Sequence, residues 1–198
     1  MKKQLKIVVL AKQVPDTRNV GKDAMTPEGT VNRAALPAIF NPEDLNALEA
    51  ALFLKDETEG STVHILTMGP PRAADIIRDA IFRGADGGYL LTDRKFAGSD
   101  TLATSYALSC ALRKIQPDVI VGTGGYASFP ALKMGAKLGI PTCVHESNAV
   151  PGLTTKLVAR TASRVMVSFE SSREHYPEPE RVLLTGTPVR EEFLFAKR

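Results

Sequence analysis

The sequence has few cysteines, no recognisable signal peptide and no long apolar run. Only two cysteines, Cys110 and Cys143, occur in 198 residues, and their apolar surroundings favour core packing over disulfide or catalytic roles. The first apolar run is interrupted by Lys12 and lacks a small-residue cleavage site, so it is predicted to be a strand. No apolar run approaches the roughly 18 residues that a membrane-spanning helix needs. We therefore expect a cytoplasmic protein.

Charge of one sign is not concentrated in any segment. The formal net charge is +3, with 24% charged residues, and Lys and Arg are scattered along the chain. Nucleic acid is therefore not an expected partner. The sequence also has no metal-ligand cluster, Walker loop, nucleophile elbow or Gly-x-Gly-x-x-Gly fingerprint. For this reason we predict no metal and assign no catalytic residue.

Short apolar runs alternate with helical patterns from one end of the chain to the other. The predicted strands are Leu5–Ala11, Thr62–Met68, Gly88–Thr92, Val119–Val121, Thr142–His145, Arg164–Ser168 and Val182–Thr185. The predicted helices are Pro42–Thr58, Pro71–Arg83, Asp100–Ile115, Phe129–Leu138, Leu153–Thr161 and Val189–Ala196. Continuous apolar strands are typical of a sheet covered on both faces. The pattern predicts one α/β domain over 1–198, a Rossmann-like, doubly wound, mostly parallel sheet of about six to seven strands with helices on both faces.

Local signals place some helix ends. Asn41 before Pro42 predicts an N-cap followed by a proline at the first helical position, and Gly84 and Gly139 are typical of C-terminal stops. The segment Asn19–Phe40 fits no helical period and is predicted to be a loop or hairpin. Ligands of open α/β sheets bind beyond the carboxyl ends of the strands, so we expect the turns after the strands to form the site.

The first half resembles a known family. Its motifs are Lys6-Ile-Val-Val-Leu-Ala-Lys-Gln-Val-Pro-Asp16, Phe40-Asn-Pro-Glu-Asp44, Met68-Gly-Pro70 and Gly84-Ala-Asp86. On these motifs, residues 1–115 resemble the β subunit of electron-transfer flavoproteins. The resemblance implies AMP as a ligand, with Leu10, Asn41, Pro42 and Met68 beside its adenosine, and the pair Asp100-Thr101 at the start of a crevice-side helix. It places FAD mainly on a partner α subunit, so we expect no FAD on this chain alone.

The second half starts at a glycine-rich turn. Gly122-Thr-Gly-Gly-Tyr126 follows a buried strand and precedes a helix, an arrangement that points backbone N–H groups at an anion. Strand-to-helix turns also use glycine merely to reverse direction. The turn stands where the flavoprotein family has the loop that wraps the AMP phosphate, so the expected AMP site lacks that wall and no tightly bound cofactor is predicted.

Two later motifs give the second half its own resemblance. With His145-Glu-Ser-Asn-Ala-Val-Pro-Gly-Leu-Thr154 and Thr185-Gly-Thr-Pro-Val-Arg-Glu191, residues 116–198 resemble the acceptor-side domain of MurG-type N-acetylglucosaminyltransferases of peptidoglycan synthesis. The resemblance implies an acceptor diphosphate at Gly124, Gly125 and Tyr126, cleft positions for Glu146, Asn148 and Arg190, and peripheral membrane contact. For His145 we expect a hydrogen-bonded, buried imidazole rather than a proton-transfer group.

These resemblances predict a chimera with its junction near 113–118. The glycosyltransferase family also needs a glycine-rich loop after the first strand, where this chain has Lys12-Gln-Val-Pro15, and a donor domain that we expect to begin where this chain stops. The first hypothesis is a fused scaffold with a residual phosphate- or nucleotide-binding cradle at Gly122, Thr123, Gly124, Gly125 and Tyr126. The alternatives are an acceptor-side glycosyltransferase fragment and an AMP-binding, electron-transfer flavoprotein β-like subunit. The sequence does not predict the oligomeric state.

Overall fold

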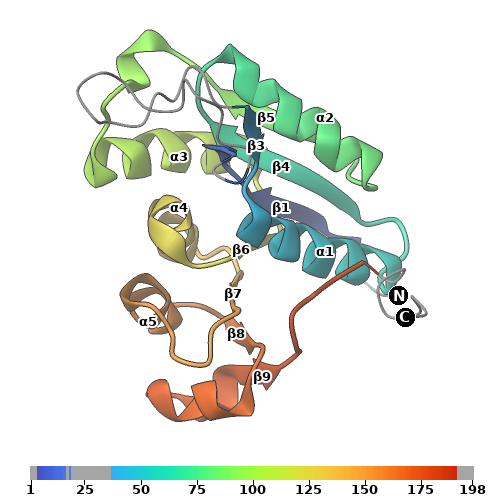
Figure 1. The fold of residues 1–198 in the computed structure, drawn as a ribbon, viewed down its shortest axis with the longest axis vertical. Coiled ribbons are helices and arrows are strands. Elements are labelled where there is room, and N and C mark those ends of the chain that lie inside the picture. Colours follow the sequence, from blue (N-terminus) through green and yellow to red (C-terminus); the bar gives the residue numbers. More distant parts are fainter. Residues whose placement is uncertain (1–3, 17, 19–36, 191–198) are drawn as a thin grey trace.

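The computed structural model describes residues 4–16, 18 and 37–190, and the side chains of 125–127 are not described. Its centre is a seven-stranded sheet in the order β5-β4-β1-β6-β7-β8-β9, and every pairing within it is parallel (Figure 1). The strands are β1 (Lys6–Leu10), β4 (Thr62–Met68), β5 (Gly87–Leu91), β6 (Val119–Gly122), β7 (Thr142–Glu146), β8 (Arg164–Val167) and β9 (Val182–Leu184). The doubly wound parallel α/β fold expected from the sequence is confirmed.

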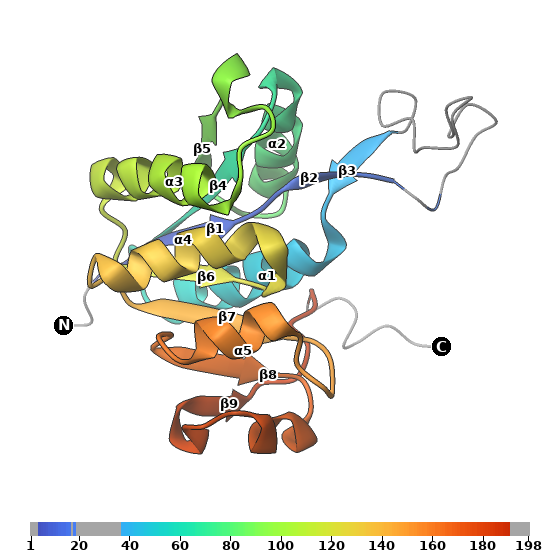
Figure 2. The ribbon, with the colours of Figure 1, turned by 90° about the vertical axis from the view of Figure 1, so that its left-hand side faces the viewer.

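Helices cover both faces of this sheet. They are α1 (Pro42–Asp56), α2 (Ala74–Phe82), α3 (Thr101–Ile115), α4 (Gly125–Lys137) and α5 (Leu153–Ala159), with short 3-10 turns at Pro71–Ala73, Arg94–Phe96, Glu170–His175 and Pro179–Arg181. In Figures 1 and 2, α3, α4 and α5 lie on one side, and α1 and α2 on the other. The continuous apolar strands are therefore buried on both faces.

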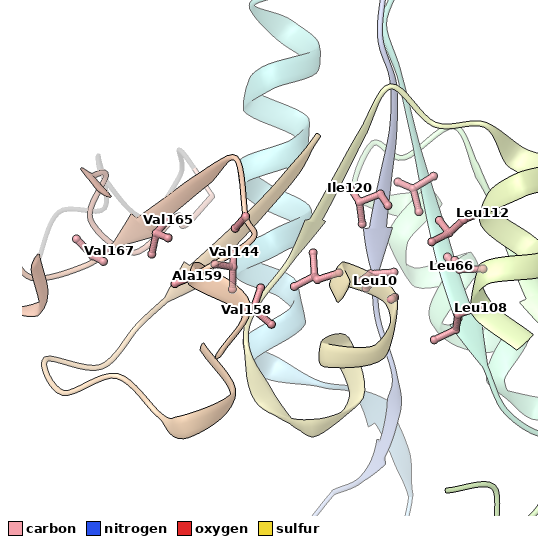
Figure 3. Close-up of a cluster of buried hydrophobic side chains, with 14 of the residues drawn as sticks. Leu10, Leu66, Leu108, Leu112, Ile120, Val144, Val158, Ala159, Val165 and Val167 are labelled. Carbon is pink, nitrogen blue, oxygen red and sulfur yellow. The ribbon is translucent and has the colours of Figure 1, made fainter. Parts of the chain in front are cut away.

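Each face has its own apolar core. On the α3–α5 side, Leu10 and Ile120 of the sheet pack with Leu112 of α3 and Val158 of α5 (Figure 3). On the α1–α2 side, Ile7 and Ile65 pack with residues such as Leu48 of α1. Sheet residues alternate between the two cores because successive side chains of a strand point to opposite faces.

The two halves of the sequence share the middle of the sheet. β1 pairs with β4 of the first half and with β6 of the second. The Lys6 N–H donates to Asp118 Oδ2 at 3.0 Å, and the Asp118 N–H donates to the Lys6 carbonyl at 2.9 Å. The sheet order reverses at β1, because β4 and β5 extend the sheet on one side of it and β6 to β9 extend it on the other. In doubly wound folds such a switch point is where the ligand crevice opens.

Several local predictions differ from the structure. α4 begins at Gly125, four residues before the predicted Phe129, and Pro130 lies inside it. Asn41 is the N-cap residue of α1, as expected, but its side chain makes no capping hydrogen bond. Val189 and Arg190 are not helical, and the remainder of that predicted helix lies outside the described residues. The predicted excursion 19–40 ends in β3 (Ala38–Phe40), which pairs antiparallel with β2 (Gln13–Pro15), and residues 19–36 are not described.

Candidate functional site

A hollow lined by described residues lies at the carboxyl ends of β1, β4 and β5. It is a cleft of about 1340 Å³ whose apolar floor includes Leu10, Leu66 and Leu108. The other lining residues are Ala11, Lys12, Asp44, Met68, Gly69, Pro70, Pro71, Thr92, Asp93, Arg94, Phe96, Ala97, Gly98, Ser99, Asp100, Thr101, Thr104, Ser128, Pro130 and Ala131. An apolar hollow with a few converging polar groups is the common form of a small-molecule site. We call it the β1–β5 cleft.

The order of the strands sets the order of polar groups along the β1–β5 cleft. Arg94 follows β5 at one end, Met68 follows β4 in the middle, and Lys12 follows β1 towards the other end. Hydroxyl groups of Ser99 and Thr101 belong to the wall that leads into α3. Two cationic side chains and several hydroxyls therefore border an apolar floor.

Acidic side chains in the wall organise local backbone. Asp93 accepts from the Lys95 N–H at 2.9 Å, and Asp100 caps α3 by accepting from the Ala103 N–H at 2.8 Å. The Asp100 cap explains why α3 begins where the sequence predicted, because a carboxylate at this position satisfies a free N–H of the first turn. It also means that the helix α3 N-terminus already carries a negative charge.

Asp44 is the buried carboxylate of the cleft. It lies in the first turn of α1 with 6% of its surface exposed. Its Oδ2 accepts from the Lys12 N–H at 2.9 Å, and its Oδ1 accepts from the Thr123 hydroxyl at 2.8 Å. Burial raises the pKa of the Asp44 carboxyl above its usual range, and hydrogen bonds from Lys12, Thr123 and Asn41 oppose part of that rise. Asp44 thus joins the loop after β1 to the loop after β6.

The glycine-rich turn after β6 lies beside the cleft rather than in its lining. A side chain at Gly122 would meet Leu132, Ser128 and Leu10, so this glycine permits close packing of α4 on the sheet. Gly124 has φ +28°, and a Cβ there would meet the Thr155 hydroxyl of α5. Of the segment that starts with this turn, the residues that line the cleft are Ser128, Pro130 and Ala131.

Glu146 and Asn148 form a separate structure after β7. One Glu146 oxygen accepts from the Asn148 N–H at 2.9 Å and from the Asn148 side-chain amide at 2.8 Å. The other accepts from the Gly152 N–H at 3.2 Å. Glu146 is buried, and its carboxylate therefore shapes the turn into α5. Neither residue lines the β1–β5 cleft.

His145 is held in the interior next to that turn. Its Nε2 lies 2.9 Å from the Gly186 carbonyl and its Nδ1 lies 3.4 Å from the Ser147 hydroxyl. Burial lowers the pKa of the imidazole, which the contacts with Gly186 and Glu146 partly oppose. A neutral imidazole that donates from Nε2 and accepts at Nδ1 satisfies both partners.

The sequence-predicted residues are thus divided among several places. Leu10 and Met68 line the β1–β5 cleft, together with Asp100 and Thr101. Pro42 and Arg190 line a second cavity of about 340 Å³, between α1 and the segment that returns from β9. Asn41 is buried beside Asp44. The roles predicted for these residues stay predictions.

Sequence reasoning missed Asp44, Lys12 and Arg94 as cleft residues. In the sequence, Asp44 stands out only as the end of the motif Phe40-Asn-Pro-Glu-Asp44, and Lys12 only as the charge that interrupts the first apolar run. A signal did exist for Lys12 and Arg94, which follow closely on predicted strand ends at the expected ligand edge, but not for Asp44, which follows the predicted loop or hairpin 19–40. No helix of the described residues is long and apolar enough to cross a bilayer.

Curated relatives point to one family. CarD, a subunit of the caffeyl-CoA reductase-Etf complex of Acetobacterium woodii, is 48% identical over 123 residues, which cover 62% of this chain and 46% of CarD. The electron transfer flavoprotein subunit beta of Megasphaera elsdenii is 52% identical over 114 residues, covering 58% of this chain and 42% of that protein. The chain therefore spans less than half the length of these two relatives.

A longer alignment crosses the predicted junction. The electron transfer flavoprotein subunit beta of Clostridium acetobutylicum is 40% identical over 158 residues, covering 77% of this chain and 60% of that protein. Its sequence identity is lower than that of the two shorter alignments, but the alignment extends past residues 113–118. Flavoprotein resemblance is thus not confined to the first half.

Solved structures share the fold rather than the sequence. MurG of Acinetobacter baumannii superimposes with a TM-score of 0.58 at 19% identity, covering 94% of this chain and 46% of MurG. The UDP-GlcNAc 2-epimerase of Neisseria meningitidis superimposes with a TM-score of 0.61 at 12% identity, covering 92% of this chain and 46% of the epimerase. At these identities the likeness shows the architecture alone.

Two family models match the chain in overlapping ranges. The Glycosyltransferase family 28 N-terminal domain matches residues 94–167, and the Electron transfer flavoprotein domain matches residues 28–128. The two expected resemblances are therefore both found, in the expected order along the sequence. The flavoprotein match covers half of the chain, and on that evidence the chain belongs to the electron transfer flavoprotein domain family.

Proposed function

We propose that this chain binds a phosphate-bearing nucleotide, with AMP as the first candidate, in the β1–β5 cleft. The observation that carries the proposal is the cleft itself, an apolar floor at the carboxyl ends of the central strands with Lys12 and Arg94 at its border. Membership of the flavoprotein domain family supports AMP over other nucleotides. The chain's role is then to bind, and no catalytic residue is assigned to it.

The cleft fits the chemistry of such a ligand. A planar base packs on apolar surface such as that of Leu10, Leu66 and Met68, which releases ordered water. Phosphate oxygens accept hydrogen bonds from hydroxyl and guanidinium groups, which Ser99, Thr101 and Arg94 supply on the β5 and α3 side of the cleft. Ligand pockets commonly measure about 300–1,000 Å³, so a cleft of about 1340 Å³ is large enough for a nucleotide.

The glycine-rich turn has a supporting role in this proposal. The sequence predicts a phosphate- or nucleotide-binding cradle at Gly122–Tyr126. A side chain added at Gly122 or Gly124 would meet Leu10, Leu132 or Thr155, so these glycines have a packing role. The turn positions α4, whose Ser128 reaches the cleft. Because one wall of the flavoprotein site is replaced, we expect weak binding, on the order of −4 to −6 kcal/mol.

A glycosyltransferase function is the second candidate. It is favoured by the match of residues 94–167 to the family 28 N-terminal domain. In that case the ligand is a diphosphate-bearing acceptor near Gly124 and Asn148, and transfer requires a donor domain. Release of UDP from UDP-N-acetylglucosamine by this chain together with a donor domain and a lipid acceptor, above the buffer background, would support this candidate.

Thermal unfolding with and without ligand tests the proposal. A ligand at ten times its Kd adds about 1.4 kcal/mol to native stability, which raises Tm by roughly 3–5 °C. We expect AMP to produce this rise and UDP and pyrophosphate to produce less. The replacement Thr104→Phe should abolish the rise because residue 104 lines the cleft.

The matched control is Ala103→Phe, since Ala103 is the exposed neighbour of Thr104 on the same helix. It should keep the AMP response. Equal AMP responses in the wild type and Thr104→Phe would place binding elsewhere, and no response to AMP in either would reject the proposed function.

A further inference from the structure

Asp44 differs from the other acidic groups of the β1–β5 cleft in its surroundings. Asp93 is exposed to solvent, and Asp100 is committed to the first turn of α3. Asp44 is buried, and it receives hydrogen bonds from the loop after β1 and from the loop after β6. A buried charge is poorly screened, so it acts on a bound ligand more strongly than an exposed charge at the same distance.

The groups that face Asp44 do not cancel this charge fully. Lys12 supplies its backbone N–H and a positive side chain, Thr123 supplies a hydroxyl, and Asn41 supplies a side-chain amide. The remaining charged residues of the cleft, Asp93, Arg94 and Asp100, follow β5 and precede α3. The strand order places these three towards the β5 end, and Asp44 towards the β1–β6 end.

We propose that Asp44 is a specificity-determining residue of the β1–β5 cleft, whose negative charge disfavours phosphate at the β1 end and directs it towards Arg94. This inference rests on the proposed nucleotide function. It makes Asp44 a regulator of that site, because neutralising its carboxylate removes the penalty against a phosphate. The ligand's uncharged part then occupies the floor nearest Asp44.

Loss of the charge need not break the hydrogen bonds that Asp44 makes. The amide of an asparagine at this position can accept from the Lys12 N–H through its oxygen and donate to the Thr123 hydroxyl through its nitrogen. A protonated Asp44 can do the same with its carboxyl hydroxyl. Since burial raises the pKa of Asp44, protonation begins at a milder pH than for an exposed aspartate. Asp44→Asn therefore reproduces the neutral state with the loops still joined.

Calorimetric titration of the full chain with AMP and with adenosine tests the inference. At pH 7.5 we expect Asp44→Asn to bind AMP about fivefold more tightly than the wild type, as removal of a partly screened charge implies. The same variant should bind adenosine, which has no phosphate, within about twofold of the wild type. The control is Asp56→Asn, which removes the same charge from the exposed far end of α1 and should change neither affinity.

The pH dependence of AMP affinity is a second measurement, and a purely structural role of Asp44 would not affect it. AMP itself takes up a proton near pH 6, but that change is common to both proteins. The ratio of the wild-type Kd to the Asp44→Asn Kd should fall towards one as pH decreases from 7.5 to 4.5, because wild-type Asp44 becomes protonated.

The outcomes separate the two proposals. AMP binding with the same affinity in wild type and Asp44→Asn at all pH values overturns the role of Asp44 and leaves nucleotide binding intact. Equal gains for AMP and adenosine also overturn it, because they indicate a change of shape rather than of charge. No binding of AMP to either protein overturns the proposed function and this inference together.

Discussion

Gly135 lies where α4 packs closely on the sheet, and its missing side chain is a packing requirement. A Cβ there would meet Ile120 of β6 and Thr142 of β7. We expect Gly135→Ala to lower the free energy of unfolding by about 1–2 kcal/mol, because overpacking outweighs the gain in helix propensity. Gly152→Ala is the control, since Gly152 has open space around it and φ −65°. Denaturant titration measures both, and equal stabilities of the two variants would contradict the packing argument.

His145 should make stability depend on pH near neutrality. Its pKa is lowered in the folded chain, mainly by burial, so above about pH 6.5 it is neutral in both states and carries no penalty. As pH falls below that value the unfolded state binds the proton first, and native stability decreases through the lowered pKa.

The pKa of His64 is also lowered, so the effect of His145 is read as the difference between wild type and His145→Gln. Glutamine can still donate to the Gly186 carbonyl. Unfolding free energies measured from pH 7.5 to 5 should show a steeper loss for the wild type, and parallel curves would show that His145 does not titrate as argued.

At the residue scale the sequence predicted positions better than roles. Gly122 and Glu146 do lie at the ligand edge of the sheet, but the partners that explain them are distant in sequence. Both carboxylate oxygens of Glu146 accept hydrogen bonds from the turn that follows it, and the strand pattern of the sequence does not predict these contacts. For Asp44 the partner is distant in sequence. A carboxylate at the start of a helix is usually solvated, and the burial of Asp44 is explained only when Thr123, from another strand–helix unit, is placed beside it.

Between elements, the Asp44–Thr123 hydrogen bond ties α1 to the turn before α4. Thr123→Val keeps the shape of the side chain but leaves a buried carboxylate with one donor fewer, so we expect a loss of about 1–3 kcal/mol in unfolding free energy. Thr161→Val is a suitable control because its hydroxyl bonds only within its own helix end, to the Val158 carbonyl. Similar losses of unfolding free energy in both variants, measured by denaturant titration, would show that the Asp44–Thr123 hydrogen bond stabilises the fold no more than a local one.

The elements themselves followed from the sequence because their signals are local. All seven predicted strands exist, since each is a short, mostly apolar run, and the parallel sheet buries the inner ones such as β1 and β6 on both faces. The start of α4 was misplaced because two glycines and a proline in 124–130 indicate a turn by composition. Tertiary packing overrides that preference: the close approach of Gly122 and Gly135 to their neighbours lets the helix lie against the sheet.

Across the whole molecule, strand β1 joins the two halves of the chain in one sheet. Because β1 pairs on one side with β4 and on the other with β6, neither half can lose its strands without exposing β1. We therefore predict a single cooperative unfolding transition in calorimetry, with equal calorimetric and van't Hoff enthalpies. Two resolved transitions would instead describe two domains meeting near 113–118.

Amide-shift mapping of an AMP titration tests the central claim most directly. If the β1–β5 cleft is the nucleotide site, the amides that move at AMP concentrations near Kd belong to Lys12, Met68, Ser99 and Thr101, which line it. Amides of Asn148 and Gly152, two strands away from β1, should stay in place. Shifts confined to Gly124, Asn148 and Gly152, with none at Met68 or Thr101, would contradict the account and return the ligand to the glycine-rich turn.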